Sequence, residues 1–322
     1  MNPDVVDAIG RLRTEGVVSE AASRTLLRAA RRELVTVRFE LKTLLYAGIV
    51  LIAGGVGLLV KENADRLGPW TVSLLVALAA AACFAYVARH APPFSWETTA
   101  VPHLAFDYVL LLGLALLGCD LAYLETKADI LGRNWPYHFL AVALVAGLSA
   151  YRWDLRGALA VALTSFAAWR GVSARMPLGP FTSRTSAITR ENALAVGALF
   201  LLAAYLSVRW KRKAHFEGVF ANLGLLLLLG GLLSGAFEAG RGTRGAWTLA
   251  VLAVSGAVMA AAFRLGRPLY FAQAFVAAYL AVVRQLFDIV GSATIGLFLT
   301  TVSSAAALAV LVWVNRRMKE RA

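Results

Sequence analysis

Residues 215–237 read HFEGVFANLGLLLLLGGLLSGAF, and this stretch decides the fold. After Glu217 no charged side chain follows until Glu238. A helix needs about 20 apolar residues to cross the hydrocarbon core of a bilayer, so the stretch predicts a transmembrane helix. Its glycines 224, 231 and 235 repeat at spacings of seven and four, which predicts a face that packs closely against another helix.

Similar apolar runs fill most of the remaining chain. The 322 residues are 59% hydrophobic and only 16% charged, and the apolar residues fall in blocks, unlike the mixed spacing of a soluble core. We therefore predict an all-α fold, a polytopic integral membrane helical bundle with about ten transmembrane helices. The predicted spans are 41–60, 69–89, 104–124, 137–151, 155–172, 192–209, 215–237, 246–263, 268–287 and 295–314.

The stretch 137–172 is the weakest part of this prediction. Tyr151, Arg152, Asp154 and Arg156 give only a thin polar break between two apolar runs. Two short spans fit the stretch, and so does one span followed by a re-entrant segment, which leaves nine or eight spans as alternatives.

Basic residues predict the orientation, because lysines and arginines near span ends are retained on the cytoplasmic side. With the N-terminus inside, 21 of the 32 basic residues fall inside, and both termini are predicted to be cytoplasmic. The net charge of +13 then reflects topology and contact with anionic membrane lipids. Nucleic-acid binding is not needed to explain it and is not predicted.

The chain divides into three predicted regions: a cytoplasmic helical module at 1–40, the transmembrane bundle at 41–316 and a basic cytoplasmic tail at 317–322. Gly16 and Ser19 are expected to end one helix of the module and cap a second. The second helix, over 20–44, carries a heptad-like apolar stripe. The stripe fits a protein partner or self-association, and it also fits a first helix that folds back to cover it, which is the interpretation we favour.

One segment resembles a known family. The string LRTEGVVSE at 12–20, a glycine-rich first span and then Asn63, Asp65 and Trp70 resemble the predicted bacterial membrane proteins of the domain-of-unknown-function family 2157. The likeness covers roughly the first 100 residues. Ala64 stands where that family usually has a tryptophan, so its turn motif is only partly matched. The resemblance implies a multi-pass protein of the bacterial plasma (inner) membrane and carries no established activity.

Ionisable side chains inside the predicted spans are the candidate functional residues. A charge at the bilayer centre costs roughly 2.5–3.5 kcal/mol on insertion scales, so each should face protein or water. With the predicted orientation, Asp120, Arg170, Arg284 and Asp288 all lie toward the outer leaflet. We predict that they line one outward-facing polar pocket. The alternative is that each charge is locally paired or snorkels to the membrane surface.

No motif indicates catalysis, a metal site or a cofactor. Histidines 90, 103, 138 and 215 have no compact ligand spacing, and hydrated span ends explain them. We therefore predict no catalytic residue, no metal ligand and no cofactor. The leading functional hypothesis is a transporter-like or lipid- or solute-handling bundle. The alternatives are a membrane scaffold or sensor whose N-terminal module binds a partner, and, less favoured, an intramembrane enzyme.

Overall fold

The computed structural model describes residues 68–98, 104–171, 183–238 and 241–321, together with scattered residues between 19 and 58. The chain divides into two compact units, Met1–Leu58 and Leu59–Ala322. The described part of the second unit is helical and contains no strand. Its helices are α4 (Pro69–His90), α5 (Leu104–Ala128), η1 (Gly132–Asn134), α6 (Tyr137–Trp153), α7 (Arg156–Trp169), α8 (Ser183–Arg209), η2 (Ala214–Phe216), α9 (Glu217–Glu238), α10 (Arg241–Arg264), α11 (Pro268–Val290) and α12 (Ala293–Arg321).

Each predicted span from 69–89 onward coincides with one α-helix of the structure. Local chemistry explains several ends: α4 and α11 begin with a proline, which is favourable at a first helical position. Gly291, at φ 66°, ends α11 in the left-handed region. The structure extends α8 back to Ser183 and α12 on to Arg321, so these helices are longer than their apolar runs.

Seven of the described helical segments are long and apolar enough to cross a membrane. They are Pro69–His90, Ala105–Ala128, Thr189–Arg209, Ala214–Glu238, Gly242–Arg264, Pro268–Val290 and Thr294–Met318. The helices α6 and α7 have 17 and 14 residues. At 1.5 Å per residue they measure only about 25 and 21 Å, less than a hydrocarbon core of roughly 30 Å. The protein is thus membrane-embedded, and within the described residues seven helices, against ten predicted spans in the whole chain, are long enough to cross fully.

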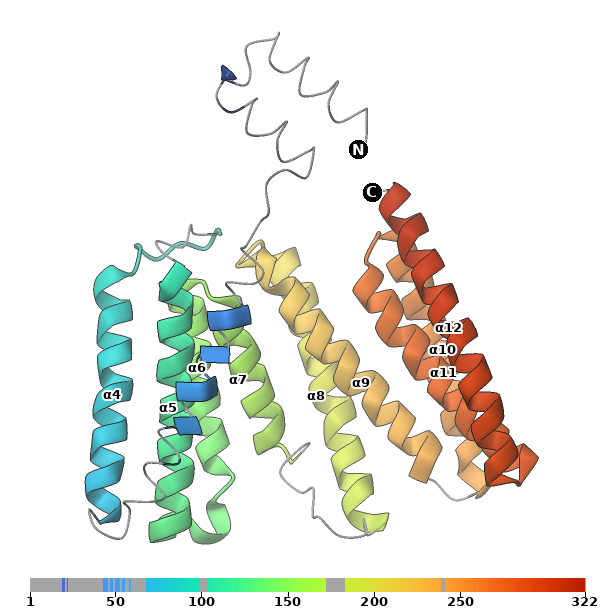
Figure 1. Cartoon of the computed structure of the whole chain (residues 1–322), viewed down its shortest axis with the longest axis horizontal. Helices are drawn as coiled ribbons and strands as arrows, with labels where there is room; N and C mark the ends of the chain where they lie inside the picture. The colour runs from blue at the N-terminus through green and yellow to red at the C-terminus, as the bar shows by residue number, and fades with distance from the viewer. Residues whose placement is uncertain are drawn as a thin grey trace. The chain divides into compact units, whose positions relative to one another are not determined.

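Helices that follow one another along the chain pack as pairs, with α4 against α5, α6 against α7, α8 against α9 and α10 against α11 (Figure 1). The closest pair is α8 and α9. A Cβ added at Gly197 would lie 2.7 Å from the backbone nitrogen of Leu228, and one at Gly224 would lie 3.1 Å from the carbonyl oxygen of Gly197. Gly224, one of the three glycines of the face predicted in 215–237, therefore does allow two backbones to meet.

Small side chains fill the contacts between α6 and α7, and large apolar ones cover much of the outside. Ala146, Ala150 and Ala158 are fully buried at the contacts of α6 and α7. Leu148 on α6 and Leu249 on α10, in contrast, are 73% and 69% exposed. A soluble monomer rarely exposes extended apolar patches, so these exposed leucines agree with helices that face lipid.

The first unit is described at few positions. Ser19 Oγ accepts a hydrogen bond from the backbone N–H of Ala22 at 3.3 Å, which confirms the predicted cap. The described residues between Thr43 and Leu58 are helical. The rest of the predicted two-helix module, including Gly16 and most of the 20–44 stripe, lies outside the described residues.

Candidate functional site

Three connections meet at one end of the second unit: the loop after α4, the turn between α6 and α7, and the loop between α8 and α9. Arg152 at the end of α6 donates a weak hydrogen bond, 3.4 Å long, to the carbonyl of Pro92. The backbone N–H of Lys213 donates to the carbonyl of Trp96 at 3.0 Å. These contacts hold the 91–98 loop against two other segments that are remote in sequence.

A single carboxylate lies at the centre of this junction. Asp154 Oδ1 is 2.8 Å from Lys213 Nζ and 2.5 Å from His215 Nε2. The side chains of Lys213 and Asp154 are only 1% and 5% exposed. Burial of a charge is costly unless it is paired and hydrogen-bonded, so removal of either partner leaves the other unfavourably placed.

The backbone at both charged residues is unusual. Asp154 has φ 62° and Lys213 has φ 50°, a left-handed conformation that costs a non-glycine residue on the order of 1–3 kcal/mol. The Lys213 ammonium also lies over the rings of Phe94 and Phe216, 5.5 and 5.9 Å from their centroids. The ion pair and the aromatic rings together fix the two tight turns.

His215 extends the network to the surface. Its Nδ1 lies 3.2 Å from Thr98 Oγ1. An ionised Asp154 can only accept hydrogen bonds, which places a hydrogen on Nε2 of a neutral His215 and lets Nδ1 accept from Thr98. A carboxylate, an imidazole and a hydroxyl in series also occur in nucleophilic catalysis. Here, however, Lys213 already neutralises the carboxylate, which weakens its support for an imidazolium.

An aromatic and basic surface covers the network; it consists of Phe94, Trp96 and Arg212. The Phe94 and Trp96 rings meet edge to face with centroids 5.0 Å apart, and the Arg212 guanidinium lies 5.0 Å from the centroid of the Trp96 ring. Trp96 is 46% exposed. Within the described residues, no carboxylate pairs with Arg212.

At the opposite end of the helices, two of the four residues predicted to line a polar pocket form a salt bridge with each other. Arg284 Nη1 lies 2.6 Å from Asp288 Oδ1, one turn away on α11. Arg244 of α10, which was not predicted, lies 2.6 Å from the other carboxylate oxygen. The Arg284 guanidinium also packs 6.0 Å from the ring of Phe237 on α9. Asp288 thus forms salt bridges with two arginines that belong to two different helices.

The other two predicted residues lie against other helices. Asp120 of α5 is buried near Ser73 of α4, and its Oδ1 has no hydrogen-bond partner among the described residues. Arg170, at the end of α7, is exposed and donates a long 3.5 Å hydrogen bond to Asn192 of α8. Convergence of all four residues on one pocket stays a prediction. Of the family-like turn residues, Trp70 is the second residue of α4 and is exposed, whereas Asn63 and Asp65 lie outside the described residues.

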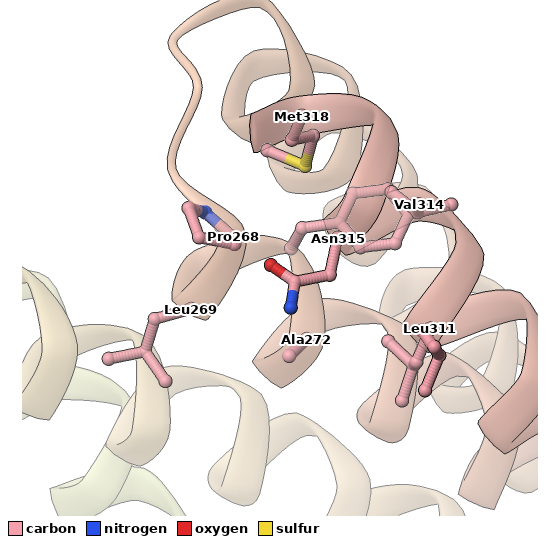
Figure 2. Close-up of a pocket in the computed structure, with 9 residues that line it drawn as sticks. Pro268, Leu269, Ala272, Leu311, Val314, Asn315 and Met318 are labelled. Carbon is pink, nitrogen blue, oxygen red and sulfur yellow. The ribbon is translucent and has the colours of Figure 1, made fainter. Parts of the chain in front are cut away.

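Two apolar hollows lie along α11. One, of about 340 Å³, is formed with the end of α12, and Figure 2 shows Asn315 turned toward Pro268 and Ala272. The other, of about 370 Å³, lies between α9 and α11, and we call it the α9–α11 groove. Its lining consists of Leu226, Leu229, Gly230, Leu233, Ala272, Gln273, Val276, Ala277 and Leu280.

Sequence reasoning did not identify the Asp154 network. Asp154 was interpreted as part of a polar break and His215 as a hydrated span end. Lys213 stands in a run of basic residues that the topology already explained. The available signal was an acidic residue inside a very short turn between two apolar helices.

No family model, no curated protein and no solved structure matches this chain, so membership of the family of unknown function 2157 stays a prediction.

Proposed function

We propose that the chain is a ten-span protein of the bacterial plasma membrane, with both termini cytoplasmic, that binds a membrane lipid in the α9–α11 groove. This is the lipid-handling form of the hypothesis drawn from the sequence. The observation that carries it is the groove itself, an apolar hollow open along two helices that are long and apolar enough to cross a membrane.

The ends of α6 and α7 support the count of ten. Asp154 between them meets Lys213 beyond the end of α8. Arg170 at the far end of α7 meets Asn192, near the start of the apolar segment of α8. α7 therefore extends between the two ends of the apolar segment of α8, Thr189–Arg209. Arginines 156 and 170 at the ends of α7 can snorkel, and local thinning of the bilayer accommodates a short span at modest cost.

The shape of the groove suits an acyl chain. The hollow exists because three of its lining residues, Gly230, Ala272 and Ala277, are small. Leu226 and Val276 at its sides are 56% and 44% exposed, so the groove opens outward, toward the lipid. A chain lying there would exchange contacts with mobile neighbours for contacts with ordered side chains.

One polar group lies in the groove. Gln273 Nε2 donates to the carbonyl of Asn222 at 3.4 Å, and its Oε1 is buried with no hydrogen-bond partner among the described residues. Gln273 is five residues into α11, or about 7 Å along the helix at 1.5 Å per residue. This depth corresponds to the border between headgroups and hydrocarbon. A lipid hydroxyl at that level would supply the missing donor.

Charged groups close the same end of the groove. Glu217 at the start of α9 accepts a hydrogen bond from the Tyr270 hydroxyl at 3.3 Å and lies 3.4 Å from Arg267. Arg267 is half exposed and packs beside the Tyr270 ring. A lipid whose chain occupies the groove would bring its headgroup to Arg267.

Filling the groove tests the proposal. A Cβ at Gly230 meets no atom within 4 Å, so Gly230→Phe should fold and place its ring in the hollow. Gly256 on α10 has equal space and does not line the groove, which makes Gly256→Phe the matched control. Native mass spectrometry of the full chain, extracted in mild detergent, should show a retained lipid on the parent and the control and its loss from Gly230→Phe. Equal retention by all three proteins would refute lipid binding in the groove.

An outward-facing polar pocket for an anionic solute is the second candidate. It is favoured by Arg244 and Arg284, which both contact the carboxylate of Asp288 and so place two guanidinium groups at this end of the helices. The scaffold or sensor alternative depends on the helix 20–44, most of which lies outside the described residues.

A further inference from the structure

The surface formed by Phe94, Trp96 and Arg212 lies where headgroups of a lipid bilayer would be. It follows the end of α4 and precedes the start of α9, two helices that are able to cross a membrane. Tryptophan is enriched at this level of a bilayer because one part of its ring system is apolar and its N–H is polar. Trp96 and Phe94 are nearly half exposed, which is unfavourable in water and favourable at a lipid interface.

The charge around this surface is strongly unbalanced. Exposed arginines and lysines lie at the helix ends on this side of the second unit, whereas Glu97 is the exposed carboxylate of the described loop. Asp154 is buried and already paired with Lys213 and His215. The exposed basic residues at the ends of α4, α6 and α8, at the start of α7 and in the loop after α8 are Arg89, Arg152, Arg156, Arg209, Lys211 and Arg212.

Arg212 differs from the other basic residues of this group because its guanidinium is held against an aromatic ring. Its guanidinium lies over the Trp96 ring, 5.0 Å from the centroid, which limits its rotation and leaves its N–H donors for another acceptor. Arginine binds phosphate with two parallel hydrogen bonds, a geometry that lysine cannot reproduce. The residue is therefore arranged for a phosphate in the plane of the headgroups.

The buried network explains why the surface is ordered. Lys213, next to Arg212, holds the Trp96 carbonyl through its backbone N–H and Asp154 through its ammonium. His215 holds Thr98, two residues after Trp96. The Asp154 network thus fixes the positions of Trp96 and Arg212, the two residues whose side chains are stacked. The buried charges, although costly, serve to order this surface.

We propose that Trp96 and Arg212 form a specific site for the phosphate of an anionic phospholipid headgroup, with Asp154, Lys213 and His215 as its positioning residues. This site is independent of the α9–α11 groove, because it lies on different segments of the chain and binds through charge. Phosphatidylglycerol is the probe that represents this headgroup class, and phosphatidylcholine is its neutral counterpart.

The test must separate a built site from a diffuse positive charge. The full chain is placed in nanodiscs of phosphatidylcholine with a minor fraction of photoreactive phosphatidylglycerol, and cross-linking to residues 91–98 and 211–216 is measured by peptide mapping. Arg212→Lys and Trp96→Leu both keep the net charge. The first removes the guanidinium, and the second removes the aromatic ring that orients it. Each is expected to reduce cross-linking several-fold, whereas a diffuse charge would leave it unchanged.

A second comparison holds the charge change constant. Arg212→Gln and Lys211→Gln each remove one positive charge from neighbouring positions. A basic residue near an anionic surface contributes roughly 1 kcal/mol, or about fivefold in affinity. We expect Lys211→Gln to lose no more than this factor and Arg212→Gln to lose clearly more. Thr98→Val, which removes only the hydroxyl that meets His215, should lower cross-linking while preserving every charge.

Equal effects of Arg212→Gln and Lys211→Gln, with no effect of Arg212→Lys and Trp96→Leu, would overturn the proposal in favour of diffuse attraction. Capture of a protein in place of phosphatidylglycerol, when a cross-linker at Trp96 is used in native membranes, would overturn it in favour of a protein interface. Gly230→Phe serves as the separating control, because it should abolish groove binding and leave cross-linking at 91–98 intact.

Discussion

Lys213 and Asp154, which are 59 residues apart in the sequence, form a salt bridge of 2.8 Å that is almost completely buried, and both residues have left-handed backbone conformations. The contact joins the turn between α6 and α7 to the loop between α8 and α9. Each turn contains a buried charge whose partner lies in the other turn, so the two turns depend on each other. The stability of this end of the bundle should therefore depend on the pair.

Replacing Lys213 by Met should destabilise the protein strongly. The change keeps most of the side-chain volume and leaves the Asp154 carboxylate buried without its ammonium partner, a loss of about 3–5 kcal/mol in the free energy of unfolding. Arg267→Gln is the control, because the 3.4 Å pair of Arg267 with Glu217 is half exposed and should contribute about 1 kcal/mol or less. Denaturant unfolding in detergent measures both.

Removing both charges refines this prediction. Asn tolerates the left-handed conformation of residue 154, so Asp154→Asn combined with Lys213→Met should recover part of the lost stability. A Lys213→Met variant as stable as Arg267→Gln would show that the buried pair contributes no more than a surface pair.

Gly197→Ala should weaken the packing of α8 on α9. The new Cβ would lie 2.7 Å from the Leu228 nitrogen and 2.9 Å from the Gly224 oxygen, and backbone atoms cannot move aside as a side chain can. Overpacking of this kind costs about 1–3 kcal/mol. Gly256→Ala, in open space on α10, should instead stabilise its helix by up to about 1 kcal/mol. Thermal unfolding in detergent should move in opposite directions, and equal shifts would contradict the observed contact.

The helices were predictable from the sequence because their signals are local. Hydropathy located every described span, and Pro268 and Gly291 explain the ends of α11. Hydropathy failed where a helix is polar: residues 183–191 include charged and hydroxyl side chains, so the predicted start of α8 at 192 is late. The same lack of an apolar signal hid the last turns of α12.

The candidate site was much less predictable, for a physical reason. A buried lysine and an exposed one look alike in sequence, and only the fold brings Asp154 to Lys213 and His215. Helical periodicity sets Arg284 beside Asp288, four residues further on, but such a rule works only within one helix. It carries no information on Arg244, which belongs to the neighbouring helix and completes the pair.

The predicted outward pocket can be tested through energetic coupling. Residues that share one polar site should be non-additive, whereas distant sites add within about 0.3–0.5 kcal/mol. A double-mutant cycle with Asp120→Asn and Arg284→Gln should therefore show a larger coupling if the pocket exists. Asp288→Asn with Arg284→Gln is the positive control, since these two side chains are in contact. Additive effects of the first pair beside clear coupling of the second would remove Asp120 from the pocket.

Reporter fusions should place the loops around 129–133 and 241–244 outside the cytoplasm, and those at 93–97, 211–214 and 318–322 inside. The reason is the concentration of basic residues at the ends of α4, α8 and α12. The structure adds a constraint that is independent of charge. Because Lys213 is hydrogen-bonded to Trp96, the 93–97 and 211–214 fusions must report the same side whatever the orientation. An external signal from both would reverse the predicted orientation and keep the fold, whereas opposite signals from the two would contradict the fold itself.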